Sequence, residues 1–198
     1  INTVRGQETG YATWNPLFNN TQTGGNGALS DGNLYITKST HGVNLGNFEM
    51  TSGKWYYEGT TGDGNMMIGV MGSDFTASSY SYTWDKSYGI YPYSPTYVVA
   101  GSFSGTPNTG GAVQGSPGTY GIAIDVDNKK MWIHKDGIWT NNTPYSGIAD
   151  VTLSDSPGFF AWYHSAATAQ ENNCETNFGQ KPFKFPPPDG FQPLNAAN

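Results

Sequence analysis

The sequence is poor in charged residues, in cysteine and in long apolar runs. Its 198 residues include 9 Lys and Arg against 15 Asp and Glu, and the net charge is −6. A chain with this excess of acidic residues offers no basic surface to nucleic acid or to an anionic membrane. No apolar run reaches the length of about eighteen residues that a membrane-spanning helix needs. We therefore expect neither nucleic-acid binding nor membrane insertion.

The sequence lacks the residue patterns that usually bind metals and cofactors. Cys174 is the one cysteine, so the chain has no internal disulfide and no cysteine-based zinc site. His41, His134 and His164 are scattered and belong to no recognisable motif, and phosphate-binding Gly loops are absent. These observations predict that the protein uses no metal and no cofactor. Cys174 has no positively charged neighbour in the sequence, so we expect an inert thiol.

Helical periodicity is missing as well. No window shows sustained apolar spacing of three and four residues, while 27 Gly and 12 Pro suit many turns between short strands. Aromatic residues make up 15% of the chain, so the core should be built from Tyr, Trp and Phe rather than from Leu. The composition predicts an all-β fold, which at this length usually forms one unit.

The strongest strand pattern lies in residues 118–139. Tyr120, Ile122 and Ile124 alternate with small or acidic residues, and this period of two predicts a strand with one buried face. Asp127 and Asn128 suit the turn that follows, and a second turn is expected at residues 135–137. Further strands are expected at residues 29–38 (as a short hairpin), 55–58, 66–71 (buried on both faces), 87–91 and 158–164.

Enzymatic motifs are absent from the sequence. Asp125 and Asp127 point to the same face of the expected strand, but no calcium-loop pattern follows them, so we expect them to shape the turn and bond nearby backbone. Residues 101–105 have Phe103 where a nucleophile elbow has Ser. The chain also lacks a Glu-x-Asp-x-x-Glu strand of the kind found in sandwich-fold glycosidases. His134, at a turn, is expected to be exposed or bonded to the backbone. We expect a non-enzymatic protein.

Six segments, in their order, resemble the motifs of SPRY domains. They are residues 52–58 (SGKWYYE), 68–70 (IGV), 87–89 (SYG), 121–127 (GIAIDVD), 131–137 (MWIHKDG) and 177–183 (NFGQKPF). The resemblance implies a curved antiparallel β-sandwich of the concanavalin-like jelly-roll type. It divides the chain into an arm or linker at residues 1–13, one SPRY-like sandwich at residues 14–194 and a tail at residues 195–198.

A narrower resemblance is to SPRY-type modules of bacteriophage virion proteins. It rests on residues 14–17 (WNPL), 29–34 (LSDGNL), 53–56 (GKWY) and 191–195 (FQPLN). It implies a tail-fibre, capsid-fibre or decoration protein on the virion surface, made in the host cytoplasm. Its partners would be other virion proteins, further copies of itself, or a host-surface glycan or protein. Two alternatives remain open: a cellular SPRY adaptor that binds a short peptide, and a carbohydrate-binding module.

Binding is expected at two loops, residues 80–97, which are rich in Tyr, and residues 101–118, which are rich in Gly. Tyr combines a flat apolar ring with a hydroxyl at low entropic cost, which favours protein contacts. Most of the rings must nevertheless fill the core. The residues predicted to contact a partner are Tyr80, Tyr82, Trp84, Tyr93 and Tyr97, and those predicted to form the core are Trp55, Tyr57, Ile122, Ile124, Trp132 and Phe178.

Overall fold

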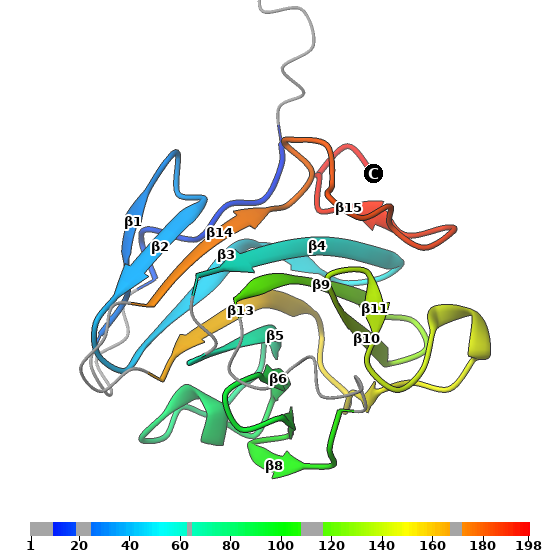
Figure 1. Cartoon of the computed structure of the whole chain (residues 1–198), viewed down its shortest axis with the longest axis horizontal. Coiled ribbons are helices and arrows are strands. Elements are labelled where there is room, and N and C mark those ends of the chain that lie inside the picture. Colours follow the sequence, from blue (N-terminus) through cyan, green and yellow to red (C-terminus); the bar gives the residue numbers. More distant parts are fainter. Residues whose placement is uncertain (1–9, 19–24, 63–64, 108–116, 167–171) are drawn as a thin grey trace, which may run out of the picture.

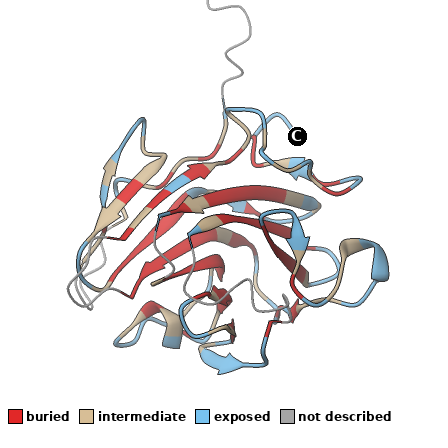
Figure 2. Ribbon diagram, viewed as in Figure 1, coloured by how far each residue is buried: buried red, intermediate tan, exposed pale blue. Residues whose placement is uncertain are grey.

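Two antiparallel sheets pack face to face in the computed structural model, which describes residues 10–18, 25–62, 65–107, 117–166 and 172–198. The sheets curve over one another, and the buried residues lie mainly along their paired strands (Figures 1 and 2). No helix among these residues is long and apolar enough to cross a membrane. The prediction of an all-β sandwich is confirmed.

The larger sheet contains nine of the described strands. Only the pairing of its last strand, β15, with β4 is parallel. The path through the sheet is β1 (Ala28–Ser30), β2 (Tyr35–Lys38), β14 (Asn172–Asn177), β4 (Lys54–Thr61), β9 (Gly118–Asp125), β10 (Lys130–Lys135) and β11 (Ile138–Trp139), while β12 (Val151–Thr152) pairs with β10 and β15 (Gln192–Pro193) with β4.

The smaller sheet contains six of the described strands. Its order is β3 (Gly42–Met50), β13 (Phe159–Ser165), β5 (Met66–Gly72), β6 (Ser87–Tyr91), β7 (Thr96–Val99) and β8 (Ser102–Ser104). Two short 3-10 helices, η1 (Ser81–Thr83) and η2 (Pro144–Ser146), lie in the connections outside the sheets. Part of the expected 101–118 loop, residues 108–116, lies outside the described residues.

The β9–β10 hairpin forms as the sequence predicts. Asp125 pairs with Lys130, and the Asp125 carboxylate accepts hydrogen bonds from the backbone N–H and side-chain amide of Asn128, each at 2.9 Å. The Asp127 carboxylate accepts one from the backbone N–H of Gly53. The second turn has positive φ at Asp136 (50°) and Gly137 (82°), as a tight I′ hairpin turn requires. Both acidic residues of the first turn therefore bond backbone, as expected.

The central core lies between the sheets and is largely aromatic, β-branched and Met. Tyr57, Ile122, Ile124 and Phe178 are buried in it with relative exposures of 0%. The rings of Phe178 and Trp14 meet edge to face at 5.4 Å, and Phe178 lies at the same distance from Tyr57. A core built from stacked and edge-on rings compensates for the scarcity of Leu.

One core prediction needs correction. Trp55 is only half-buried at the edge of the central core, because it lies near the start of β4, where its ring contacts Phe48 and its indole N–H donates to the carbonyl of Ser52. Trp132 is a core residue as predicted, with an exposure of 3%, but in a cluster separate from the central core. It belongs to a second layer on the outer face of the larger sheet, which Tyr56, Ala123 and Phe191 share.

Each sheet is covered on its outer face as well. Segments near the C-terminus lie over the larger sheet and bring Phe183 and Phe191 onto it. The segment before β6 lies over the smaller sheet and brings Phe75, Tyr82 and Trp84 onto it. β5 is buried on both faces, as predicted, but so is β9 from Thr119 to Asp125. The prediction of one buried face for residues 118–126 is therefore wrong, because the small residues of that strand lie beneath the covering segment.

The opening and closing segments of the described chain pair with each other. Ala12 donates its backbone N–H to the carbonyl of Leu194 at 2.8 Å, and Tyr11 and Asn195 form an isolated antiparallel bridge. Leu194 in turn donates to the carbonyl of Phe178. This pairing joins Tyr11 and Ala12 of the expected arm to Leu194 and Asn195 at the end of the expected sandwich.

Two Phe→Ala substitutions, one in the core and one at the surface, should differ in how far they lower the free energy of unfolding. Phe178→Ala should lower the free energy of unfolding by about 3–5 kcal/mol, because it leaves a cavity between Trp14 and Tyr57. Phe103→Ala, at a side chain that is 51% exposed, should lower it by less than about 1 kcal/mol. Urea unfolding followed by tryptophan fluorescence measures both. Equal losses would contradict this description of the core.

Candidate functional site

The structure divides the five predicted contact residues into two groups. Tyr93 is 59% exposed, and Tyr80 and Tyr82 are half-buried. Trp84 (1% exposed) and Tyr97 (3%) are buried, so their prediction as surface residues is wrong.

The two buried rings hold the loops in place. Trp84 stacks on Phe75, with centroids 4.7 Å apart, and packs on the outer face of the smaller sheet. Its indole N–H donates to the carbonyl of Ser78. Tyr97 lies on the inner face of β7, and its hydroxyl is 2.6 Å from the hydroxyl of Thr140.

The surface rings belong to a longer series, which we name the aromatic row. It contains six rings in the order His41, Tyr80, Tyr82, Phe103, Tyr91 and Tyr93. The centroids of successive rings are 4.8, 5.3, 5.4, 5.8 and 6.1 Å apart. The three central pairs have interplanar angles of 13°, 19° and 24°, which is an offset stack.

Several elements position the row on the outer side of the smaller sheet. His41 immediately precedes β3, and Tyr80 and Tyr82 lie at η1. Tyr91 ends β6, and its hydroxyl donates to the side-chain oxygen of Asn65. Phe103 is the middle residue of β8, an edge strand, which carries it over Tyr82. The row thus joins positions that are far apart in the sequence.

A chain of hydrogen bonds anchors one end of the row in the sheet. His41 Nδ1 lies 3.3 Å from His164 Nε2, and His164 Nδ1 lies 2.8 Å from the hydroxyl of Ser81. The indole N–H of Trp162 donates to the same hydroxyl at 3.1 Å. Burial, and then the neighbouring His41, lower the pKa of His164 to about 3, so its ring is neutral near pH 7.

The hydrogen bond between His164 and Ser81 resembles that between a general base and a catalytic nucleophile, but the role of Ser81 is structural. Ser81 is 2% exposed, and its oxygen already accepts the Trp162 N–H, so a substrate carbonyl has no room to approach it. The other candidate nucleophile, Cys174, is fully buried, and burial raises the pKa of its thiol to about 12. Both groups are held in unreactive states.

The row offers rings and hydroxyls that suit a protein surface. Phe103 and Tyr93 present the most exposed apolar area, while Tyr80 and Tyr82 add phenolic oxygens beside them. Such a mixture of flat apolar area and hydrogen-bonding groups is typical of interface centres. Sequence reasoning found Tyr80, Tyr82 and Tyr93 but missed His41, Tyr91 and Phe103. Phe103 was visible only as an apolar residue inside a Gly/Ser loop.

Comparison with solved structures identifies the fold. The SPRY domain of human HERC1 superposes with a TM-score of 0.59 and 12% sequence identity, covering 82% of this chain and 96% of that domain. The fold is that of a SPRY domain. The SPRY-type order of motifs in the sequence therefore corresponds to a SPRY-type sandwich in space.

Sequence comparison adds a partial relative. Over 77 residues the chain is 35% identical to the E3 ubiquitin-protein ligase RKP of Arabidopsis thaliana. The match covers 39% of this chain and 6% of the ligase. No family model matches the chain. The SPRY fold is shown, while the similarity to the ligase is limited to 77 residues and spans a small part of the ligase's length.

The buried His164 predicts an acid-sensitive stability. An unfolded His binds a proton below about pH 6.5, whereas folded His164 stays neutral down to a pH of about 3. The unfolded chain therefore binds more protons in this window, and stability should fall as the pH drops, by up to about 1.4 kcal/mol per pH unit. In His164→Gln this contribution disappears, so the free energy of unfolding should fall less steeply between pH 6.5 and 4.

Urea unfolding of both proteins at several pH values measures the two slopes. All other titrating groups are shared, so the difference reports His164 together with its contact with His41. Identical slopes would mean that His164 is already protonated in the folded protein.

Proposed function

We propose that this chain is a non-enzymatic binding module that contacts a partner protein through the aromatic row. The observation that carries the proposal is the continuous series of six rings, two of which, Tyr93 and Phe103, are more than half exposed. The SPRY fold supports it, because SPRY domains are generally binding modules. The anchoring of the row through His41 and Tyr82 to buried His164 supplies a preorganised surface.

Peptide selection tests this proposal. Peptides selected from a displayed random library on the wild-type protein should lose affinity for Tyr93→Ala and for Phe103→Ala by about tenfold or more, as interface centres do. The matched control is Ile148→Ala, at an apolar side chain of similar exposure (63%) that does not belong to the aromatic row, and it should bind the peptides unchanged. Peptides that bind all of these variants equally would contradict the role of the row.

The setting of the module is the second part of the proposal. The virion-like segments at residues 14–17 and 191–195 favour a virion surface protein of the tail-fibre, capsid-fibre or decoration kind, with virion proteins or copies of itself as partners. The partial similarity to an Arabidopsis ubiquitin ligase weakly favours the alternative, a cellular adaptor that binds a short peptide.

Mass spectrometry of purified virus particles distinguishes these settings. The virion proposal predicts that peptides of this chain copurify with intact particles at constant stoichiometry. Absence from particles would contradict it and leave the adaptor. A glycan array probed with the wild type and with Tyr93→Ala addresses the carbohydrate alternative, because binding of a sugar that Tyr93→Ala abolishes would replace the protein partner by a glycan.

A further inference from the structure

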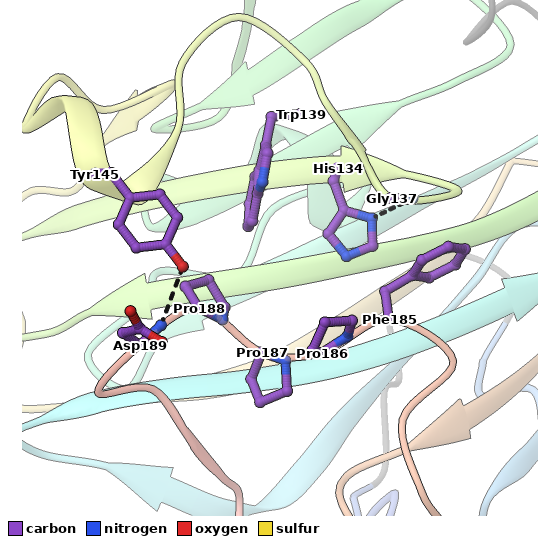
Figure 3. A pocket seen from close by; sticks show the side chains of 9 residues that line it. All are labelled: His134, Gly137, Trp139, Tyr145, Phe185, Pro186, Pro187, Pro188 and Asp189. Carbon is purple, nitrogen blue, oxygen red and sulfur yellow. Dashed lines mark hydrogen bonds between the residues drawn. The ribbon is translucent and has the colours of Figure 1, made fainter.

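A pocket of about 320 Å³ opens over the outer face of the larger sheet, whereas the aromatic row lies on the smaller sheet. Figure 3 shows the side chains that line this pocket. The strands β10 and β11, the helix η2 and the segment after Phe183 supply its lining. The lining residues are His134, Gly137, Trp139, Tyr145, Phe185, Pro186, Pro187, Pro188 and Asp189.

A buried carboxylate fixes one wall of this pocket. Glu58, 2% exposed, accepts hydrogen bonds from the backbone N–H groups of Lys184 and Phe185, each at 2.9 Å. Phe185 then lies over Gly137, where an added Cβ would come within 2.8 Å of its ring. The wall is therefore tied to β4, and the absence of a side chain at residue 137 leaves space for Phe185.

The floor of the pocket is a neutral imidazole. The backbone N–H of Gly137 donates to His134 Nδ1 at 3.1 Å, so the proton of the neutral ring lies on Nε2 and is donated to the hydroxyl of Tyr56 at 2.7 Å. That hydroxyl donates to Glu58 at 2.9 Å. Burial lowers the pKa of His134 to about 4, so the floor carries no positive charge near neutral pH.

Aromatic rings enclose the space above this floor. The rings of Trp139 and Phe185 lie 5.1 and 5.3 Å from His134 and stand at 82° and 75° to it. Tyr145 lies at the rim, and its hydroxyl accepts the backbone N–H of Asp189 at 3.3 Å. Figure 3 shows these rings around one space, with Asp189 beside Tyr145. Aromatic faces attract cations through their quadrupoles.

The charges around the pocket also favour a cation. Asp189 is exposed, and no Lys or Arg among the described residues forms an ion pair with it. In the part of the chain that the structure describes, the pocket lining contains no Lys or Arg. Pro186, Pro187 and Pro188 have no backbone N–H to offer an anion. A ligand that brings positive charge finds acceptors and rings here, whereas an anion finds few donors.

We propose that this pocket binds the arginine side chain of a partner peptide. A guanidinium group is flat, is weakly hydrated, stacks on aromatic faces and forms paired hydrogen bonds with a carboxylate. The rings of Trp139 and Tyr145 would supply the stacking face, and Asp189, whose backbone N–H binds the hydroxyl of Tyr145, would supply the carboxylate. A trimethylammonium group could use the rings but has no N–H for Asp189, and lysine is more strongly hydrated. The site is independent of the aromatic row.

Small arginine probes test the proposal without a known partner. N-acetyl-arginine amide should shift the indole N–H signal of Trp139 in the ¹H–¹⁵N NMR spectrum, saturably, with the signal assigned from Trp139→Phe. N-acetyl-citrulline amide, which has nearly the same shape and no charge, should bind at least about tenfold more weakly, because it loses the charge-assisted contact. Equal binding of the two probes would overturn the proposal.

Variants locate the site and separate it from the row. Asp189→Asn and Tyr145→Ala, both at exposed side chains, should weaken the arginine probe by about fivefold or more. Tyr93→Ala should leave binding of the arginine probe unchanged, although it should weaken binding through the row by about tenfold or more. Wild-type affinity in Asp189→Asn, or tighter binding of N-acetyl-trimethyllysine amide than of the arginine probe, would overturn the assignment to guanidinium.

Discussion

The carboxylate of Glu58 is the interaction on which the outer layer of the larger sheet depends. A buried carboxylate costs several kcal/mol unless donors surround it. Glu58 is 2% exposed and receives the hydroxyl of Tyr56 and the backbone N–H groups of Lys184 and Phe185. Lys184 also reaches the hydroxyls of Thr60 and Thr119 through its ammonium group. The strand β4 and the segment after Phe183 therefore stabilise each other.

Gly121 leaves the space that this hydrogen-bond arrangement needs. It faces His134 across the β9–β10 ladder, and an added Cβ would lie 2.0 Å from the imidazole. The missing side chain lets His134 lie across β9 and reach Tyr56 on β4. One small residue thus permits a hydrogen-bond chain that crosses three neighbouring strands, from Gly137 to Glu58.

The sequence was sufficient for the strands at residues 29–38, 55–58, 66–71, 87–91, 118–139 and 158–164 and for the order of the SPRY motifs, because both depend on local patterns, but it did not predict β3, β7, β8 or β14. The hairpin of residues 118–135 and its Asp125 and Asp127 contacts follow from alternation and turn chemistry. Long-range covering could not be predicted in the same way. The pattern suggests that Gly121 and Ala123 face solvent, whereas Gly121 lies beneath the imidazole of His134 and Ala123 packs in a cluster with Phe191 from the C-terminal segment.

The same limit explains the mixed outcome at the candidate site. Tyr82 and Trp84 are two residues apart and have the same aromatic character, yet one joins the row and the other anchors its loop. Their roles depend on Phe103 and Phe75, which approach from elsewhere in the chain. The pocket could not be predicted from the sequence. Trp139, Tyr145 and Phe185 line it together only because the backbone of residues 184–185 binds the carboxylate of Glu58.

The pairing of Ala12 with Leu194 and of Tyr11 with Asn195 has a mechanical consequence. Tension applied through the two ends of the sandwich reaches this short ladder first and bypasses the paired strands behind it. These contacts therefore break before the paired strands of the two sheets separate. Residues 185–189, which form one wall of the pocket, come shortly before β15 in the sequence, so a pull on the C-terminal end reaches the pocket before it reaches the aromatic row on the smaller sheet.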